Sequence, residues 1–167
     1  MAIFRIIFYT IRKVIVKMLT NKIFNYQFMP EYAKLFLPAD IQEEDILFFD
    51  IETTGLSHRN SRVYLIGAAL CAEGKWEMIQ FLAQEESEEE ERAVLEAFQS
   101  LCAQKRCFVH FNGSTFDIPY LQHKYQSCRL TAPFTDAVSI DLYRILQPFR
   151  PLLQTPNFRQ KSLEPLA

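Results

Sequence analysis

The chain has 167 residues, the size of one ordinary domain. Hydrophobic residues make up 49% of it and aromatic residues 14%, which is enough for a sizeable core and excludes global disorder. The formal net charge of −2 excludes binding to nucleic acid through bulk positive charge alone, although bound metal ions can reverse the local field of an acidic site.

The first 30 residues contain no acid, and five basic residues interrupt an otherwise apolar sequence. These charges are too frequent for a membrane-spanning helix of about 20 apolar residues, so we expect no membrane span. A basic amphipathic helix could lie on a membrane or on nucleic acid, but packing on its own domain or self-association explains most apolar helical faces. Proline breaks at Pro30 and Pro38 suggest an extension over residues 1–40 and an organised domain over residues 41–167.

The apolar segment that begins at Ile46 is typical of a strand buried on both faces. Asp50 and Glu52 are two positions apart, so a strand directs both carboxylates to one face, while Ile51 packs on the other. Two crowded carboxylates repel each other, and a divalent cation such as Mg²⁺ or Mn²⁺, which prefers oxygen ligands, is the simplest compensation. The alternative, in which one acid caps the next turn and the other is solvated, stays open.

A polar loop follows, and residues 62–72 and 75–82 then predict a β-hairpin that turns at Glu73-Gly74. We expect both arms to pair antiparallel beside the first strand. The acidic segment Glu85–Glu91 is better explained as a helix start than as a partner site. Ser87 and Glu90 have capping-box spacing there, and apolar residues follow at helical spacing.

Residues 107–111 predict the next buried strand, and Asn112-Gly113 is a turn pair. Ser114 and Asp117 can cap a helix that extends to about Gln126. On this local evidence Asp117 is a first-turn acid stabilised by the helix dipole. A further strand and helix start are expected over residues 137–143.

The four cysteines have no Cys-x-x-Cys spacing. We therefore expect them to be small buried hydrophobic residues of a protein in a reducing compartment, which predicts a cytoplasmic location. A zinc site is not expected. The lone His110 and His123 are better explained as core or surface groups than as metal ligands. The cysteines are Cys71, Cys102, Cys107 and Cys128.

The strand ending in Asp-Ile-Glu-Thr-Thr-Gly, the hairpin, the helix, and the strand followed by Asn-Gly-x-x-Phe-Asp-x-Pro-Tyr-Leu resemble the DEDD superfamily of 3′-5′ exonucleases. Within it, the chain most resembles the YprB-type ribonuclease H-like domain, and it is also similar to the proofreading domains of family-B DNA polymerases. The resemblance covers about Ile46 to Glu164. It implies an α/β, ribonuclease H-like fold, whose mixed central sheet has three antiparallel strands followed by parallel strands, flanked by helices.

By this resemblance Asp50 and Glu52 stand at the first exonuclease motif and Asp117 at the second, as catalytic residues and ligands of a two-metal site for Mg²⁺ or Mn²⁺. Asp50 would bridge both ions, Glu52 would hold one and orient water, and Asp117 would anchor the second. Asp141 would support the site without binding metal. The 3′ end of single-stranded DNA or RNA would be contacted by Thr53, Thr54, Gly55, Leu56, Asn112, Gly113 and Phe116. Phe116 could equally belong to the core.

The sequence departs from the family at the third motif, which supplies a fourth carboxylate four residues after a Tyr or His. Lys161–Glu164 resembles the segment before that motif, and no Tyr-x3-Asp follows, so we expect the final helix to be missing. The two-metal site could then retain only one ion. One interpretation is a metal-dependent 3′-5′ exonuclease domain, weak or inactive as this chain unless a second chain supplies the helix. The alternatives are a non-catalytic ribonuclease H-like module that binds nucleic acid or a partner, and a gene fragment.

Overall fold

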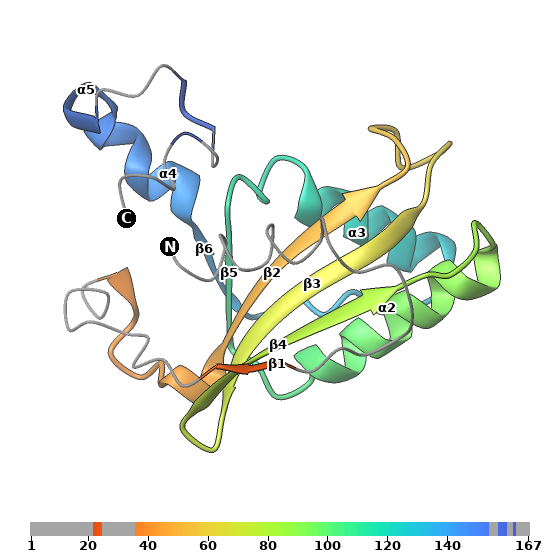
Figure 1. Ribbon diagram of the computed structural model, residues 1–167, viewed down its shortest axis with the longest axis horizontal. Helices are drawn as coiled ribbons and strands as arrows, with labels where there is room; N and C mark the ends of the chain where they lie inside the picture. Colours follow the sequence, from red (N-terminus) through yellow and green to blue (C-terminus); the bar gives the residue numbers. More distant parts are fainter. Residues whose placement is uncertain (1–21, 25–35, 154–156, 160–161, 163–167) are drawn as a thin grey trace.

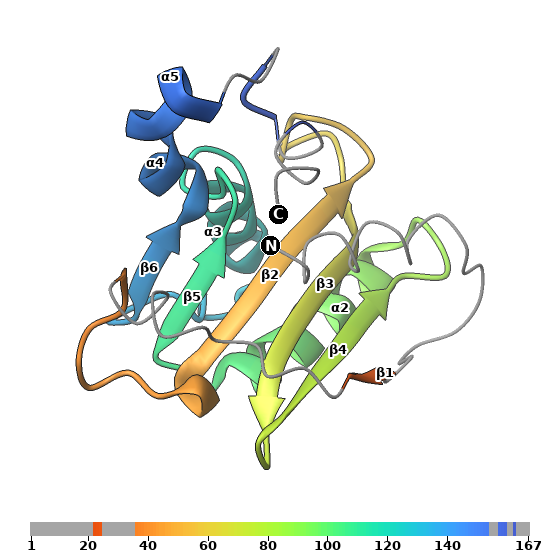
Figure 2. The same cartoon turned by 60° about the vertical axis from the view of Figure 1, so that its left-hand side comes forward.

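The computed structural model describes residues 22–24, 36–153, 157–159 and 162. Its centre is a six-stranded sheet with the order β1-β4-β3-β2-β5-β6 (Figure 2). The strands are β1 (Lys22–Phe24), β2 (Ile46–Thr53), β3 (Val63–Ala72), β4 (Lys75–Leu82), β5 (Cys107–His110) and β6 (Val138–Asp141). The helices are η2 (Glu43–Asp45), α2 (Glu88–Cys102), α3 (Asp117–Ser127), α4 (Leu142–Leu146), η3 (Gln147–Phe149) and α5 (Arg150–Leu153).

The pairing confirms the predicted mixed sheet. β3 pairs antiparallel with both β2 and β4, whereas β5 pairs parallel with β2, and β6 pairs parallel with β5. The hairpin turns at the expected place, where Glu73 and Gly74 both have positive φ, of 52° and 70°. Its second arm does not lie beside the first strand, because β4 pairs with β3 and β1.

Two helices, α2 and α3, cover one face of the sheet (Figures 1 and 2). Side chains alternate along β2, so Leu47, Phe49 and Ile51 belong to the core beneath these helices. Phe49, for example, lies 5.5 Å from the Phe98 ring of α2. Phe48 packs in the core of the opposite face. By the same alternation, the two acids of β2 lie on the face that α2 and α3 do not cover.

Two expected helix caps differ in detail. The Ser87 side chain accepts a hydrogen bond from the Glu90 N–H (3.1 Å), but the Glu90 carboxylate accepts from the Gln84 N–H (3.0 Å), so the capping box is only half formed. Ser114 does not cap α3, and that prediction is wrong. Its hydroxyl donates instead to Asp141 at 2.6 Å, a charge-assisted bond that competes well with a cap.

The N-terminal prediction falls mostly outside the described residues. The three described residues of that segment, β1, form a strand at the sheet edge rather than a helix. Within the described ranges, no helix is long and apolar enough to cross a membrane. All four cysteines are free; Cys128 is half-buried and the other three are buried.

Candidate functional site

Asp50 and Asp117 meet where β2 and β5 separate. The two parallel strands pair only over Ile46–Phe48 of β2, and β5 ends at His110. The Ile51 N–H, beyond this pairing, donates to Asp117 Oδ1 at 3.2 Å. The first residue of α3 thus replaces the missing strand. It brings its carboxylate to the carboxyl ends of the parallel strands, where ligands of such sheets usually bind.

Burial raises the pKa values of both carboxyl groups. Burial, together with the charges of Asp117 and Glu52 and a hydrogen bond to Asp117, raises the pKa of Asp50 well above its usual range. Burial also raises the pKa of Asp117 to about 6, although the Ile51 N–H and Asp50 donate hydrogen bonds to it. No described Lys, Arg or His makes an ion pair with either group. No positive charge among the described side chains therefore compensates the charges of the Asp50–Asp117 pair.

Glu52 lies on the same face of β2 as Asp50, close enough for its charge to raise the Asp50 pKa. The strand register shifts between Glu52 and Thr53, which leaves Tyr64 of β3 outside the regular pairing. Burial and the Glu52 charge raise the pKa of the Tyr64 hydroxyl, so it stays protonated. In the described part of the chain, no three His, Cys, Asp or Glu side chains are gathered so that they could hold a metal ion. The structure thus joins Asp50 to Asp117 and leaves Glu52 as a neighbour.

The segment after β2 is held in a compact loop. The Thr53 and Ser61 hydroxyls both donate to the Gly55 carbonyl, at 2.9 Å and 2.8 Å. A Cβ at Gly55 would lie 3.3 Å from the Ser61 Cβ, so this close approach suits glycine. The Thr54 hydroxyl accepts from the Arg62 N–H. The apolar Leu56 side chain is left 87% exposed at the end of the loop.

The loop between β5 and α3 is organised by Asp141. Its carboxylate accepts hydrogen bonds from the Asn112 N–H (2.7 Å), the Ser114 N–H (3.3 Å) and the Ser114 hydroxyl. Burial raises the pKa of Asp141, but these bonds and the nearby His110 outweigh it and hold the pKa below the usual value. The same carboxylate caps α4 through the Tyr143 N–H. Asp141 thus fixes the loop that leads to Asp117.

Gly113 and Phe116 complete this second loop. A Cβ at Gly113 would lie 2.8 Å from the His110 ring, so only glycine fits there without a shift. Asn112 has a φ of 60°, a conformation that asparagine tolerates well. The half-buried Phe116 packs on the core, and its ring centroid lies 5.3 Å from that of Tyr120.

The sequence interpretation missed two contacts beside the site. The Tyr120 hydroxyl of α3 lies 2.7 Å from the Ser61 Oγ, which ties this helix to the β2–β3 loop. Glu91 is buried, and it forms an ion pair with Lys124 at 3.1 Å. Glu91 lies four residues before the buried Leu95, on the apolar face of α2. This spacing indicates that Glu91 is buried, but the acidic residues around it made the signal hard to recognise.

A family model described as the RNase H superfamily matches residues 47–166, which is most of the chain. The chain belongs to the RNase H superfamily. Among curated proteins, none matches the sequence closely enough to count as a relative.

Solved structures with a similar fold include two classes of protein. An apo exonuclease I gives a TM-score of 0.56 at 18% identity, over 73% of this chain and 36% of that one. E. coli exonuclease I in complex with a dT13 oligonucleotide gives 0.53 at 17% identity, over 71% and 34%. The family B DNA polymerase of Pyrobaculum calidifontis gives 0.53 at 19% identity, over 62% and 16%. This RNase H superfamily chain therefore spans about a third of the length of exonuclease I and 16% of the polymerase, and the likeness establishes the fold.

Proposed function

We propose that this RNase H superfamily domain is a metal-dependent 3′-5′ exonuclease-like domain that acts on the phosphodiesters of DNA or RNA. The observation that carries the proposal is the buried Asp50–Asp117 pair at the carboxyl ends of β2 and β5. Buried carboxyl groups without a basic partner are costly, and functional sites are where such cost is usually retained. The complex of exonuclease I with dT13 supports a single strand as the ligand.

The donor set fits a hard divalent cation, because Asp50 and Asp117 offer only oxygen atoms. These two residues, with Glu52 beside them, would hold Mg²⁺ or Mn²⁺. A pair of such ions, when bound, activates the attacking water and stabilises the leaving oxygen in phosphodiester hydrolysis. Metal ions bind the deprotonated carboxylates, so the raised pKa values of Asp50 and Asp117 oppose binding at acidic pH.

The residues around the pair would position the strand end. Thr53, Thr54 and Gly55 form the compact loop after β2, and the exposed Leu56 offers an apolar surface for a terminal base. Asn112, Gly113 and Phe116 would form the opposite wall. Asp141 would keep that wall in place through its bonds to Asn112 and Ser114.

We expect the 167 residues alone to hydrolyse slowly. Among the described residues, no three His, Cys, Asp or Glu side chains are gathered to hold a metal ion, and the sequence has no Tyr-x3-Asp after Asp141 that would supply a fourth carboxylate and a general base. Loss of general-base assistance alone costs typically about 10²- to 10⁴-fold in rate. A second chain that supplies a carboxylate is one way to complete the site. The competing function is a non-catalytic module that binds nucleic acid or a protein partner, which the same incomplete set of ligands favours.

We also propose a cytoplasmic location, in keeping with the four free cysteines.

The experiment is digestion of end-labelled single strands of DNA and RNA in Mn²⁺, with Asp50→Asn as the inactive variant. Asp136→Asn is the matched control, because Asp136 is an exposed acid that precedes β6 and its φ of 62° suits asparagine. Slow shortening from the 3′ end that Asp50→Asn abolishes supports the exonuclease. If the chain binds the strand but does not shorten it, and a version extended by a related third-motif helix does not shorten it either, the result supports the non-catalytic module.

A further inference from the structure

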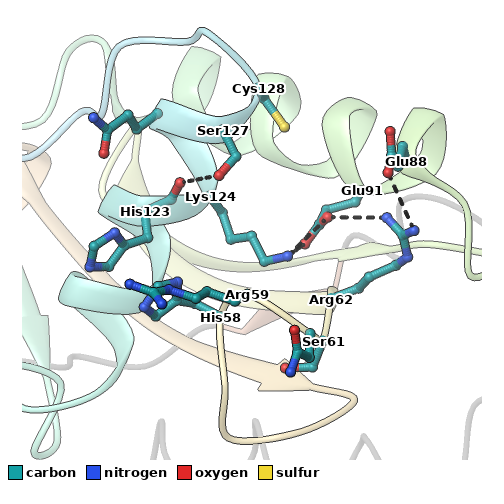
Figure 3. A pocket seen from close by; sticks show the side chains of 12 residues that line it. His58, Arg59, Ser61, Arg62, Glu88, Glu91, His123, Lys124, Ser127 and Cys128 are labelled. Carbon is teal, nitrogen blue, oxygen red and sulfur yellow. Dashed lines mark hydrogen bonds and ion pairs between the residues drawn. The ribbon is translucent and has the colours of Figure 1, made fainter.

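A pocket with a volume of about 610 Å³ lies between the β2–β3 loop, the start of α2 and the second half of α3 (Figure 3). It includes neither Asp50 nor Asp117. Basic side chains dominate its lining: His58, Arg59 and Arg62 from the loop, and His123 and Lys124 from α3. Only two carboxylates, Glu88 and Glu91 of α2, face them.

Both carboxylates are already matched by two of the basic groups. Glu91 accepts a hydrogen bond from the Val63 N–H (2.8 Å) and lies 3.1 Å from the Lys124 ammonium group and 3.6 Å from Arg62. Arg62 also lies 3.7 Å from Glu88 (Figure 3). These contacts form a neutral network along one side of the pocket.

The other three basic residues have no such partner. His58 and His123 stack face to face, with ring centroids 3.8 Å apart and planes 4° apart, and the Tyr120 ring meets His58 edge-on. Within the described ranges, no carboxylate makes an ion pair with His58, His123 or the exposed Arg59. Desolvation, followed by the charges of His123, Arg59 and Lys124, lowers the pKa of His58. This end of the pocket therefore places the guanidinium group of Arg59, which has no carboxylate partner among the described residues, beside two stacked imidazole rings.

We propose that His58, Arg59 and His123 form a binding site for a phosphate group, separate from the Asp50–Asp117 pair. Phosphate supplies the negative charge that these groups lack, and a guanidinium group beside imidazole N–H donors suits its oxygen atoms. Protonation of His58 beside His123, Arg59 and Lys124 is unfavourable, and an oxyanion held by both imidazole rings offsets this cost. The Asn60, Gln126 and Ser127 side chains add polar groups to the same lining.

The source of the phosphate is either the backbone of a bound strand or a free phosphate. The strand as source rests on the proposed function, whereas the phosphate site itself does not. A strand is favoured by the loop that the two sites share. Ser61 in this loop hydrogen-bonds to Tyr120 and to the Gly55 carbonyl, so the segment that lines the pocket is fixed to the segment beside Asp50.

The test uses the histidine ring signals in NMR spectra of the whole chain without metal. The chain has three histidines, so the signals of His58 and His123 can be assigned by substitution, and the buried His110 serves as an internal reference. Inorganic phosphate at pH 6.5 should move the His58 and His123 signals and leave the His110 signal unchanged. Arg59→Gln should weaken phosphate binding about tenfold, the loss expected for one charge-assisted hydrogen bond. Lys75→Gln removes an equal charge from the exposed hairpin and should change nothing.

A second arm replaces phosphate by single-stranded oligothymidylate in EDTA. If the strand moves the same two signals, its backbone is the source, and Arg59→Gln should lower the salt slope of binding by about 0.7 for the lost contact. If only inorganic phosphate moves them, the pocket takes free phosphate. If neither ligand moves the His58 and His123 signals, the proposal is overturned. Mn²⁺ binding at Asp50 and Asp117 is measured separately, so failure here is distinguishable from failure of the proposed function.

Discussion

The Tyr120 hydroxyl lies 2.7 Å from the Ser61 Oγ and joins α3 to the loop that follows β2. Ser61 bonds in turn to the Gly55 carbonyl, which also accepts from Thr53. α3 begins with Asp117, and β2 carries Asp50 and Glu52. One side-chain contact therefore fixes the spacing of the two segments that form the candidate site.

Tyr120→Phe should loosen this connection while it keeps the buried ring. We expect a loss of about 0.5–1.5 kcal/mol in the free energy of unfolding, the usual contribution of one hydrogen bond. Strand binding should weaken more than Mn²⁺ binding, because the variant frees the loop and leaves both carboxylates intact. Urea unfolding and the two titrations measure these effects. Equal losses in strand and metal binding would contradict a role in loop position.

Asp50→Asn should stabilise the metal-free protein at alkaline pH. The folded pair has raised pKa values, about 6 for Asp117 and well above the usual range for Asp50, so the folded state binds more protons than the unfolded chain. The contribution of this pair to the free energy of unfolding is therefore fully present below about pH 4 and is lost as the pH rises through the folded pKa values. At pH 8 we expect a gain of about 1–3 kcal/mol, or about 2–4 °C in Tm for each kcal/mol. The gain should vanish near pH 4, and Asp136→Asn should show no such dependence.

Mn²⁺ binding should release protons, because the ion binds carboxylates and the raised pKa values of Asp50 and Asp117 favour their protonated forms. Calorimetry at pH 7 in two buffers with different ionisation enthalpies measures the number released, and we expect about one per ion. Binding should tighten from pH 6 to pH 8 and be lost in Asp50→Asn. If wild type and Asp50→Asn titrate alike, the metal does not bind at this pair.

Asp141→Asn should have the opposite pH dependence. The pKa of Asp141 is lowered on folding, so its stabilisation is present above the unfolded value of about 4 and is lost as the pH falls through the folded value. At pH 7 we expect a loss of about 1–3 kcal/mol, because the bonds from Asn112 and Ser114 are no longer charge-assisted. Chemical unfolding at pH 7 and pH 3 tests this. A loss of equal size at both values would mean that the charge is not what matters.

The sequence predicts the sheet well, because strand period, turn residues and apolar runs are local signals. Ile46–Thr53, the turn at Glu73-Gly74 and the hairpin arms follow directly from them. Long-range polar contacts carry no such signal. Ser114 has the local spacing of a cap, yet it bonds to Asp141, which is 27 positions away. The stacking of His58 on His123 depends on the β2–β3 loop and helix α3, which come together only in the fold.

The pair Asp50 and Asp117 illustrates what local sequence patterns can and cannot predict. Each acid is locally explicable, Asp50 as a strand residue and Asp117 as a first-turn acid. Only the early end of β5 at His110 makes room for Asp117 to reach the Ile51 N–H of β2. The resemblance supplied what local patterns could not, namely that the two acids belong to one site.

The short strand β1 has a practical consequence for handling the protein. Lys22–Phe24 pairs with Trp76–Met78 and so covers part of the outer edge of β4. A chain shortened to begin at Ile41 would remove this cover and leave the whole length of β4 as an open edge, a surface on which strands of other molecules can add. Such a shortened chain should aggregate more readily than the full sequence, even if its own fold stays intact. Light scattering of the two forms at equal concentration would reveal the difference.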